Sequence, residues 1–261
     1  MGSAKIQGEL WGAAADRWAS EQERVCRPLW LDVLTAIDAG KGMHLFDAGC
    51  GSGGGSVDAA ARGCQVTGAD ATEPLIEIAR TRLPGSRFDV CDLESLPYDD
   101  ESFDATMAIN SVFYCADQPA VMRELCRVTR RGGLVAVTAW GPSEECEMRD
   151  IFAATASVMP PAPPAATGPV LSAPGALESA LAAAGLQPTK TGRSECPFEY
   201  DDVASAWSAQ SSSGPVQRAI QAAGEEAVRE AFAEAAIKYT QPSGRVMFHN
   251  IFLWAIGQRP R

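Results

Sequence analysis

Glycines and a carboxylate are spaced for ligand binding in the run 45–53, which reads LFDAGCGSG. A short apolar stretch ends in Asp47 and breaks into alternating glycines, and an alanine-rich helical pattern follows. Glycine lets the backbone turn sharply and lets a ligand approach closely, because it has no Cβ. A helix that begins after such a turn offers unpaired N–H groups and the positive end of its dipole. The pattern therefore predicts the floor of a nucleotide-like site.

Two further carboxylates follow predicted strands. Asp70 ends the apolar run 65–70, and Asp92 comes directly after the run 87–90. A carboxylate at the end of the second strand can accept hydrogen bonds from both hydroxyls of a ribose. Asp92 can accept from the amino group of an adenine while a neighbouring backbone N–H donates to the ring. With the glycine run, these acids predict an extended nucleoside site.

Asp47 separates two classes of ligand for this site. The glycines at 49, 51 and 54 fit the G-x-G-x-x-G pattern of dinucleotide sites, which alone is weak evidence. A carboxylate beside a pyrophosphate would repel it, whereas the sulfonium and ammonium of S-adenosylmethionine would be attracted. Asp47 therefore favours S-adenosylmethionine over NAD(P). An NAD(P)-dependent oxidoreductase stays an alternative, which the absence of a Tyr-x-x-x-Lys pair also disfavours.

The elements that must position these residues alternate along the chain. Strand patterns at 43–47, 65–70, 87–90, 103–109 and 134–140 alternate with helical patterns at 56–62, 73–82 and 119–128. This order predicts a parallel sheet with helices on both faces and right-handed crossovers. Ligands of such sheets bind at the carboxyl ends of the strands, where the three acids fall.

We expect a single domain with three parts. Residues 1–40 form an N-terminal helical lid, with a break between helices at Pro28, and residues 41–145 form the cofactor-binding core. Residues 146–261 complete the core and carry a Pro-rich loop and a helical insertion on the acceptor side. The Pro-rich loop is Met159–Pro174, the helices lie within 201–238, and the last strand is 246–257.

Four segments resemble the motifs of class I S-adenosylmethionine-dependent methyltransferases. They are Phe46–Gly53, Gly68–Thr72, Asp92–Asp104 and Glu124–Gly133. The similarity covers about residues 42–141 and is nearest to the small-molecule, ubiquinone/menaquinone-like enzymes. It implies an α/β, Rossmann-like fold: a seven-stranded, mostly parallel sheet with helices on both faces, an N-terminal helical lid and a helical insertion before the last strand. It also implies in-line transfer of a methyl group to an O, N or C atom of a small metabolite, with S-adenosylhomocysteine as product.

The resemblance implies roles for residues around the methionine portion of the cofactor. Asp47 and the backbone carbonyl of Asn110 would bind the ammonium. The turn around the methionine portion would consist of Gly49, Cys50, Gly51 and Gly53, with Cys50 as a packing residue rather than a nucleophile.

Five more residues would bind the nucleoside by the same resemblance. Asp70 would hold the ribose, and Ala71 and Leu75 would flank the ribose and the adenine. Asp92 and Leu93 would bind the adenine.

The sequence identifies no catalytic residue. A general base is needed only if the acceptor must lose a proton, and His249, Tyr114 and Glu145 are the candidates. Residues 110–115 do not match the Asp/Asn-Pro-Pro-Tyr/Phe pattern of enzymes that methylate amino groups of nucleic acids and proteins. A methyltransferase fold that binds the cofactor without methylating is a further alternative.

Apolar residues of the C-terminal part point to an aromatic or lipophilic acceptor, although such residues more often belong to the core. They are Phe198, Trp207, Ile220, Phe232 and Tyr239. Trp11 and Trp18, at helical spacing, either pack in a helix or close a lid over the methionine end.

Composition excludes several other classes. The formal net charge of -11 and pI of about 4.7 argue against a nucleic-acid partner. Eight cysteines without a C-x-x-C pair and only two histidines argue against a metal site. No secretory signal and no membrane span is visible, so we expect a cytoplasmic protein with reduced thiols. The acceptor, the methylated atom and the oligomeric state stay open.

Overall fold

A seven-stranded sheet forms the centre of the computed structural model, which describes residues 3–160 and 170–261. Its strands are β1 (His44–Ala48), β2 (Gln65–Asp70), β3 (Arg87–Val90), β4 (Phe103–Ala108), β5 (Thr129–Trp140), β6 (Gln187–Glu195) and β9 (Ile251–Gln258). Their order in the sheet is β3-β2-β1-β4-β5-β9-β6. The first five strands are parallel, and β9 is antiparallel to both of its neighbours. The predicted mostly parallel, Rossmann-like sheet is confirmed.

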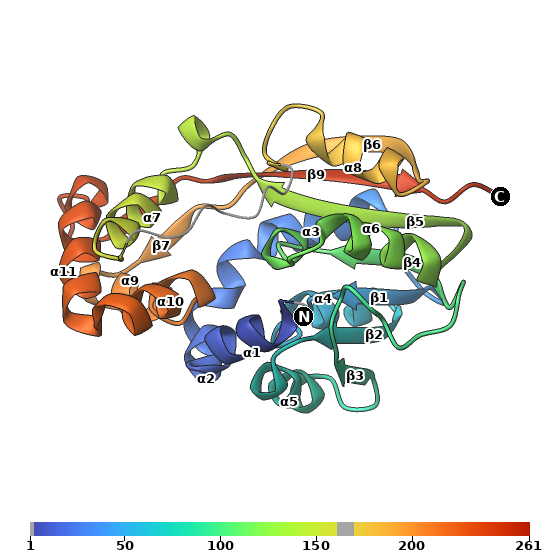
Figure 1. Ribbon diagram of the computed structural model, residues 1–261, viewed down its shortest axis with the longest axis horizontal. Helices are drawn as coiled ribbons and strands as arrows, with labels where there is room; N and C mark the ends of the chain where they lie inside the picture. Colours follow the sequence, from blue (N-terminus) through green and yellow to red (C-terminus); the bar gives the residue numbers. More distant parts are fainter. Residues whose placement is uncertain (1–2, 161–169) are drawn as a thin grey trace.

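Helices cover both faces of the sheet because its strands are apolar on both sides (Figure 1). The covering helices are α3 (Arg27–Ala36), α4 (Gly54–Ala61), α5 (Glu73–Arg82), α6 (Gln118–Val128) and α8 (Ala176–Ala183). Helices α3 and α4 contact each other, as do α6 and α8. Leu45 of β1 belongs to the apolar cluster of α3, and the next residue, Phe46, belongs to that of α6. This alternation is the two-residue period of a strand.

Two segments outside the sheet lie near the carboxyl ends of its parallel strands. The N-terminal segment comprises α1 (Ala4–Gly12), α2 (Ala15–Arg17), the π-helix η1 (Trp18–Gln22) and the 3-10 helix η2 (Glu23–Cys26). The insertion comprises α7 (Met148–Ser157), β7 (Phe198–Tyr200), α9 (Val203–Gln210), α10 (Gly214–Ala223), α11 (Glu225–Ala236) and β8 (Val246–Phe248). Its helices gather at one end of the molecule, beyond the tip of β5 (Figure 1). Short 3-10 turns at Val112–Tyr114, Ser143–Glu145 and Ile237–Tyr239 complete the elements.

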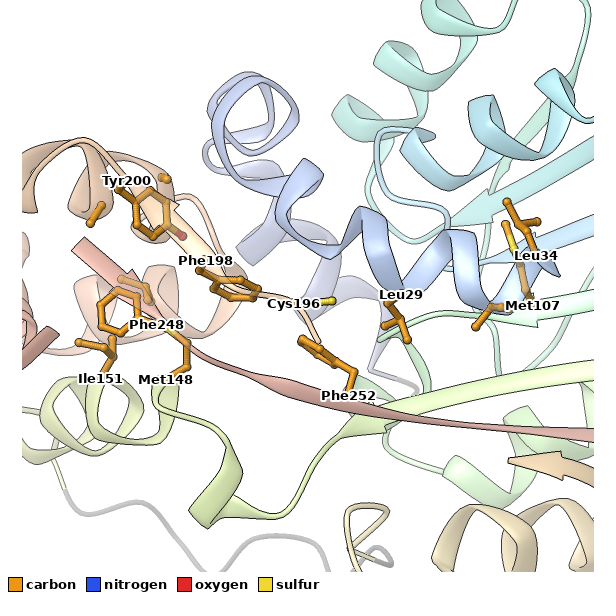
Figure 2. Packing of buried hydrophobic residues seen from close by; sticks show 14 of the residues in the cluster. Leu29, Leu34, Met107, Met148, Ile151, Cys196, Phe198, Tyr200, Phe248 and Phe252 are labelled. Atoms are coloured by element: carbon orange, nitrogen blue, oxygen red, sulfur yellow. The ribbon is translucent and has the colours of Figure 1, made fainter. Parts of the chain in front are cut away.

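One apolar cluster joins the sheet to the insertion. It extends from Met107 of β4 and Leu29 of α3, through Phe252 of β9 and Phe198 of β7, to Phe248 of β8 (Figure 2). Leu29, Met107, Phe248 and Phe252 are fully buried. The insertion is therefore packed on the core rather than tethered to it.

The structure differs from the sequence-based expectation at several strands, and the short strand β7 was not predicted. Strand β6 was not predicted, because this edge strand is mostly polar and exposed and so lacks apolar alternation. The predicted strand 246–257 is two strands, since β8 pairs with β7 and β9 joins the main sheet. Asn250 lies at the break, where its side chain accepts from the N–H of Met148 and donates to the carbonyl of Phe248. Most of the Pro-rich segment 159–174 lies outside the described residues.

All eight cysteines are free thiols. Burial is the largest cause that raises the pKa of each thiol above its ordinary value. In the described part of the chain, no helix is long and apolar enough to cross a membrane. Within the same residues no cluster of His, Cys, Asp and Glu could hold a metal ion.

Candidate functional site

One pocket opens at the carboxyl ends of the parallel strands, and ten of the eleven predicted cofactor residues line it. The ten are Asp47, Gly49, Cys50, Gly51, Asp70, Ala71, Leu75, Asp92, Leu93 and Asn110. Gly53 is outside the lining and precedes α4 as its N-terminal cap. A Cβ on Gly53 would lie 3.0 Å from the Cβ of Ala79, so this glycine permits close packing of the turn on α5.

The turn after β1 requires glycine at several positions. Gly49 and Gly51 have φ of +79° and +53°, in the left-handed region that side chains disfavour. A Cβ on Gly49 would lie 2.3 Å from the Cβ of Ser111. The N–H groups of Gly49 and Cys50 both donate to the carbonyl of Ala69, at 2.7 and 3.0 Å. These contacts join the glycine turn to the end of β2, where Asp70 follows.

Asp70 is held by backbone donors on both of its oxygens. Its Oδ2 accepts from the N–H of Gly51 at 3.0 Å, and its Oδ1 accepts from the N–H of Thr72 at 2.9 Å. Burial raises the pKa of this carboxyl above its ordinary value, although these hydrogen bonds lower it. A carboxylate has about four acceptor positions, so capacity remains for the two hydroxyls of a ribose.

Asp47 is a nearly inaccessible carboxyl group, with 4% of its surface exposed. The hydroxyl of Ser56 donates to its Oδ2 at 2.7 Å. Burial, with smaller contributions from the nearby charges of Glu23 and Asp70, raises the pKa of Asp47 to about 7, although the hydrogen bond from Ser56 lowers it. Three acids converge here, which suits a cationic ligand group and opposes a pyrophosphate.

Asn110 follows β4 with a φ of +53°, a conformation that asparagine tolerates better than most residues. Its N–H donates to the hydroxyl of Thr138 at 2.8 Å, and that hydroxyl donates to its Oδ1 at 2.9 Å. These bonds fix the backbone at the pocket wall. At the adenine end, Asp92 Oδ1 accepts from the N–H of Glu94 at 3.0 Å, and Leu93 is buried.

An ion pair that the sequence did not indicate fastens the N-terminal segment to the glycine turn. Glu23 Oε1 accepts from the N–H of Ser52 at 2.8 Å, and its Oε2 pairs with Arg82 Nη1 at 2.5 Å. Arg82 also donates to the carbonyl of Ala19 at 2.6 Å and to the Ser52 hydroxyl at 2.7 Å. We call Glu23, Ser52 and Arg82 the Glu23 clamp. These three residues are far apart in the sequence, so no spacing pattern predicted the clamp.

Aromatic side chains line the part of the pocket away from the nucleoside residues. Trp140 at the end of β5 lies 5.4 Å from Phe152 of α7 and 6.0 Å from Phe198 of β7, between ring centroids. Trp11 lies 4.7 Å from Trp18 and 5.3 Å from Tyr114 in edge-to-face contacts. The N-terminal tryptophans therefore form one wall, and β5 and the insertion form the other.

Only one of the five predicted acceptor-side residues, Phe198, lines the pocket. The other four belong to the apolar core or pack against it: Trp207, Ile220, Phe232 and Tyr239. For these four residues the alternative of a core position holds, because the helices of the insertion need their own buried faces to pack on one another.

Of the three candidate bases, Tyr114 alone lines the pocket. Burial raises the pKa of its hydroxyl above the ordinary value, which makes it a poor proton acceptor. Glu145 and His249 lie outside the lining. Glu145 pairs with Arg193, and the backbone N–H of His249 donates to Glu147 at 2.6 Å.

Residues 46–137 match the family model described as a methyltransferase domain. The chain carries a methyltransferase domain. The chain is 32% identical to malonyl-[acyl-carrier protein] O-methyltransferase of Salmonella typhimurium over 154 residues, which cover 58% of this chain and 61% of that protein. It is 34% identical to methyltransferase GfsG of Streptomyces halstedii over 132 residues, 48% of this chain and 46% of the relative. The chain thus spans about half to three fifths of the length of these relatives.

Solved structures share the fold of the methyltransferase domain. A putative methyltransferase of Bacillus halodurans matches with a TM-score of 0.61 and 14% identity, over 89% of this chain and 99% of that chain. The [4+2]-cyclase SpnF matches with a TM-score of 0.57 and 21% identity, over 89% and 80%. Geranyl diphosphate C-methyltransferase of Streptomyces coelicolor matches with a TM-score of 0.55 and 17% identity, over 98% of both chains. At these identities the likeness concerns the fold alone.

Proposed function

We propose that this protein transfers the methyl group of S-adenosylmethionine to an O, N or C atom of a small, aromatic or lipophilic acceptor. The observation that carries the proposal is a single pocket with two unlike halves. One half holds the glycine turn and the carboxylates of Asp47, Asp70 and Asp92, and the other half is aromatic. The methyltransferase domain at residues 46–137 supports the same activity.

The residues of the acidic half have complementary tasks. Asp70 and Asp92 hold the nucleoside, and Asp47 with the backbone carbonyl of Asn110 holds the methionine ammonium. When bound, the cofactor supplies a methyl group made electrophilic by its sulfonium. Trp11 and Trp18 exclude water from the methionine end. Aligning the acceptor with this methyl group can remove up to about 7–11 kcal/mol of the barrier, so in-line displacement needs little further assistance.

Isothermal titration with S-adenosylmethionine, S-adenosylhomocysteine and NADH tests the cofactor assignment. We expect micromolar binding of both sulfur compounds and none of NADH. Asp70→Ala should weaken that binding at least about tenfold, because a carboxylate that accepts two ribose hydrogen bonds is lost. Asp201→Ala, which removes an exposed carboxyl outside the pocket, is the matched control. Binding of NADH alone would return the site to the oxidoreductase alternative.

Formation of S-adenosylhomocysteine separates a methyltransferase from a fold that binds the cofactor without methylating. The acceptor in this proposal is not a nucleic acid, because the net charge is -11. The cytoplasmic location stays a prediction from the free thiols.

A further inference from the structure

We propose that the acceptor is an uncharged molecule with an aromatic body and one neutral hydrogen-bonding group, which Gln22 and Gln210 recognise together. The inference rests on the proposed function and names its acceptor class. Gln22 ends the π-helix of the N-terminal segment, and Gln210 ends α9 of the insertion. Both side chains line the pocket, although each residue is only 3% exposed.

Tyr200 holds the two amides in place. Its hydroxyl donates to Gln22 Oε1 at 2.8 Å and accepts from Gln210 Nε2 at 2.8 Å. Among the described residues, neither Gln22 Nε2 nor Gln210 Oε1 has a hydrogen-bond partner within the protein. Neither atom is among the buried side-chain atoms that lack a partner, so both are accessible from the pocket and can bond a ligand that supplies a donor and an acceptor.

Reversing both amides leaves the conclusion unchanged. If both amides were reversed, the Tyr200 hydroxyl would donate to Gln210 and accept from Gln22. One amide oxygen and one N–H group would still be left for a ligand. A primary amide, a hydroxyl or a phenol can both donate and accept hydrogen bonds and satisfies this pair. A carboxylate has no proton to donate and would be repelled by the amide oxygen.

The charges of the pocket also oppose an anionic acceptor. Its charged lining residues are all acidic: Glu23, Asp47, Asp70 and Asp92. In the lining as described there is no Lys, Arg or His, and the sequence of residues 161–169 contains none. Two nearby cations have other partners, since Arg82 pairs with Glu23 and Arg17 donates to the hydroxyl of Ser211 at 3.3 Å. An anion would lose its hydration without gaining a counter-charge from the protein.

This pocket therefore does not suit the anionic substrates that the names of two similar proteins contain. A malonyl group and a diphosphate are both anionic, and they appear in the names of a relative and of a structural neighbour. A cationic acceptor is also unsuitable, because it would lie beside the positive sulfonium of the cofactor. Trp140, Phe152 and Phe198 provide apolar and aromatic surface for the body of a neutral acceptor.

Three naphthalene probes of matched size test the acceptor class on protein saturated with S-adenosylhomocysteine. They are 2-naphthamide, 2-naphthoate and naphthalene, titrated at pH 7.5. We expect the amide to bind at least about tenfold more tightly than the anionic 2-naphthoate, with naphthalene in between, because a hydrogen-bonded neutral group gains where a carboxylate is desolvated.

Variants of the two glutamines separate recognition from simple packing. Gln210→Leu and Gln22→Leu should each abolish the advantage of 2-naphthamide over naphthalene and leave the affinity for S-adenosylhomocysteine unchanged. Gln210→Lys should shift the preference toward 2-naphthoate by adding a counter-charge. Gln221→Leu, an exposed glutamine of α10 outside the pocket, is the matched control and should change nothing.

Three results would overturn the acceptor class: equal or tighter binding of 2-naphthoate, an amide preference that survives both leucine variants, or no binding of 2-naphthamide to the saturated protein. Binding of S-adenosylhomocysteine is measured first, so loss of the cofactor site is recognised separately as failure of the proposed function. Retained S-adenosylhomocysteine affinity shows that a leucine variant is folded.

Discussion

The carboxyl group of Asp47 titrates within the physiological pH range. Burial raises its pKa to about 7, so the free protein holds this group half protonated near neutrality. The ionised form attracts a cationic ligand, whereas the protonated form does not. The charge state of a single residue therefore couples cofactor affinity to pH.

We predict that the affinity for S-adenosylmethionine falls as the pH is lowered from 8 to 6. The sign follows from the raised pKa: Asp47 is ionised above about 7 and gains a proton below it. Titration calorimetry at pH 6, 7 and 8 measures the effect, which should approach about tenfold per pH unit at the acid end. Asp47→Asn should bind weakly at every pH and remove the dependence. A wild-type affinity that is flat over this range would contradict the prediction.

At the scale of elements, the Glu23 clamp connects cofactor binding to the position of the N-terminal segment. Glu23 is 7% exposed, and its carboxylate holds the glycine turn through Ser52 and α5 through Arg82. Removing the Glu23 carboxylate takes away the acceptor of the Ser52 N–H and the negative charge paired with Arg82, whose side chain is 30% exposed. The clamp should therefore keep the segment closed over the turn.

Glu23→Gln is predicted to loosen the N-terminal segment and weaken binding of S-adenosylhomocysteine about tenfold. Limited proteolysis should show faster cleavage within residues 3–26, and calorimetry should show the lower affinity. Arg27→Gln serves as the control. It breaks the ion pair with Asp58, and we expect little effect because the Arg27 side chain is 57% exposed. Equal behaviour of the two variants would mean that the clamp has no special role.

The nucleoside side of the site could be predicted from the sequence because its residues follow strand ends of a parallel sheet. Asp47, Asp70 and Asp92 each come at or just after a strand, so local pattern and fold together bring them to one pocket. Gln22 and Gln210 could not be found in this way. They meet through Tyr200, and the contact of Gln22 with Tyr200 joins residues 178 positions apart. Such contacts depend on packing between segments, which periodicity does not encode.

For the whole molecule, the continuous cluster of Figure 2 implies that the sheet and the insertion depend on each other for stability. The boundaries of the three parts expected from the sequence stay a prediction. One apolar cluster contains side chains from both the cofactor-binding core and the insertion. Joint burial of this kind favours a single cooperative unfolding transition.

Phe232→Ala should lower the free energy of unfolding by about 3–5 kcal/mol, because a fully buried ring of α11 that packs on Trp207 is replaced by a cavity. Urea unfolding followed by circular dichroism and by binding of S-adenosylhomocysteine should report one coincident transition. Ile237→Ala, in the adjoining turn, removes a side chain from a residue that is 68% exposed and should change stability little. Two separate transitions in the Phe232 variant would show that the insertion folds independently.

The eight free thiols, four of them buried and four partly buried, make the protein convenient for site-selective labelling. A thiol reacts with maleimide as the thiolate, and the raised pKa of every native cysteine keeps that form scarce at pH 7. A cysteine introduced at an exposed position, such as Ile6→Cys in α1, would react far faster than the native ones. A fluorophore placed there could follow the N-terminal segment during turnover without removal of any natural cysteine.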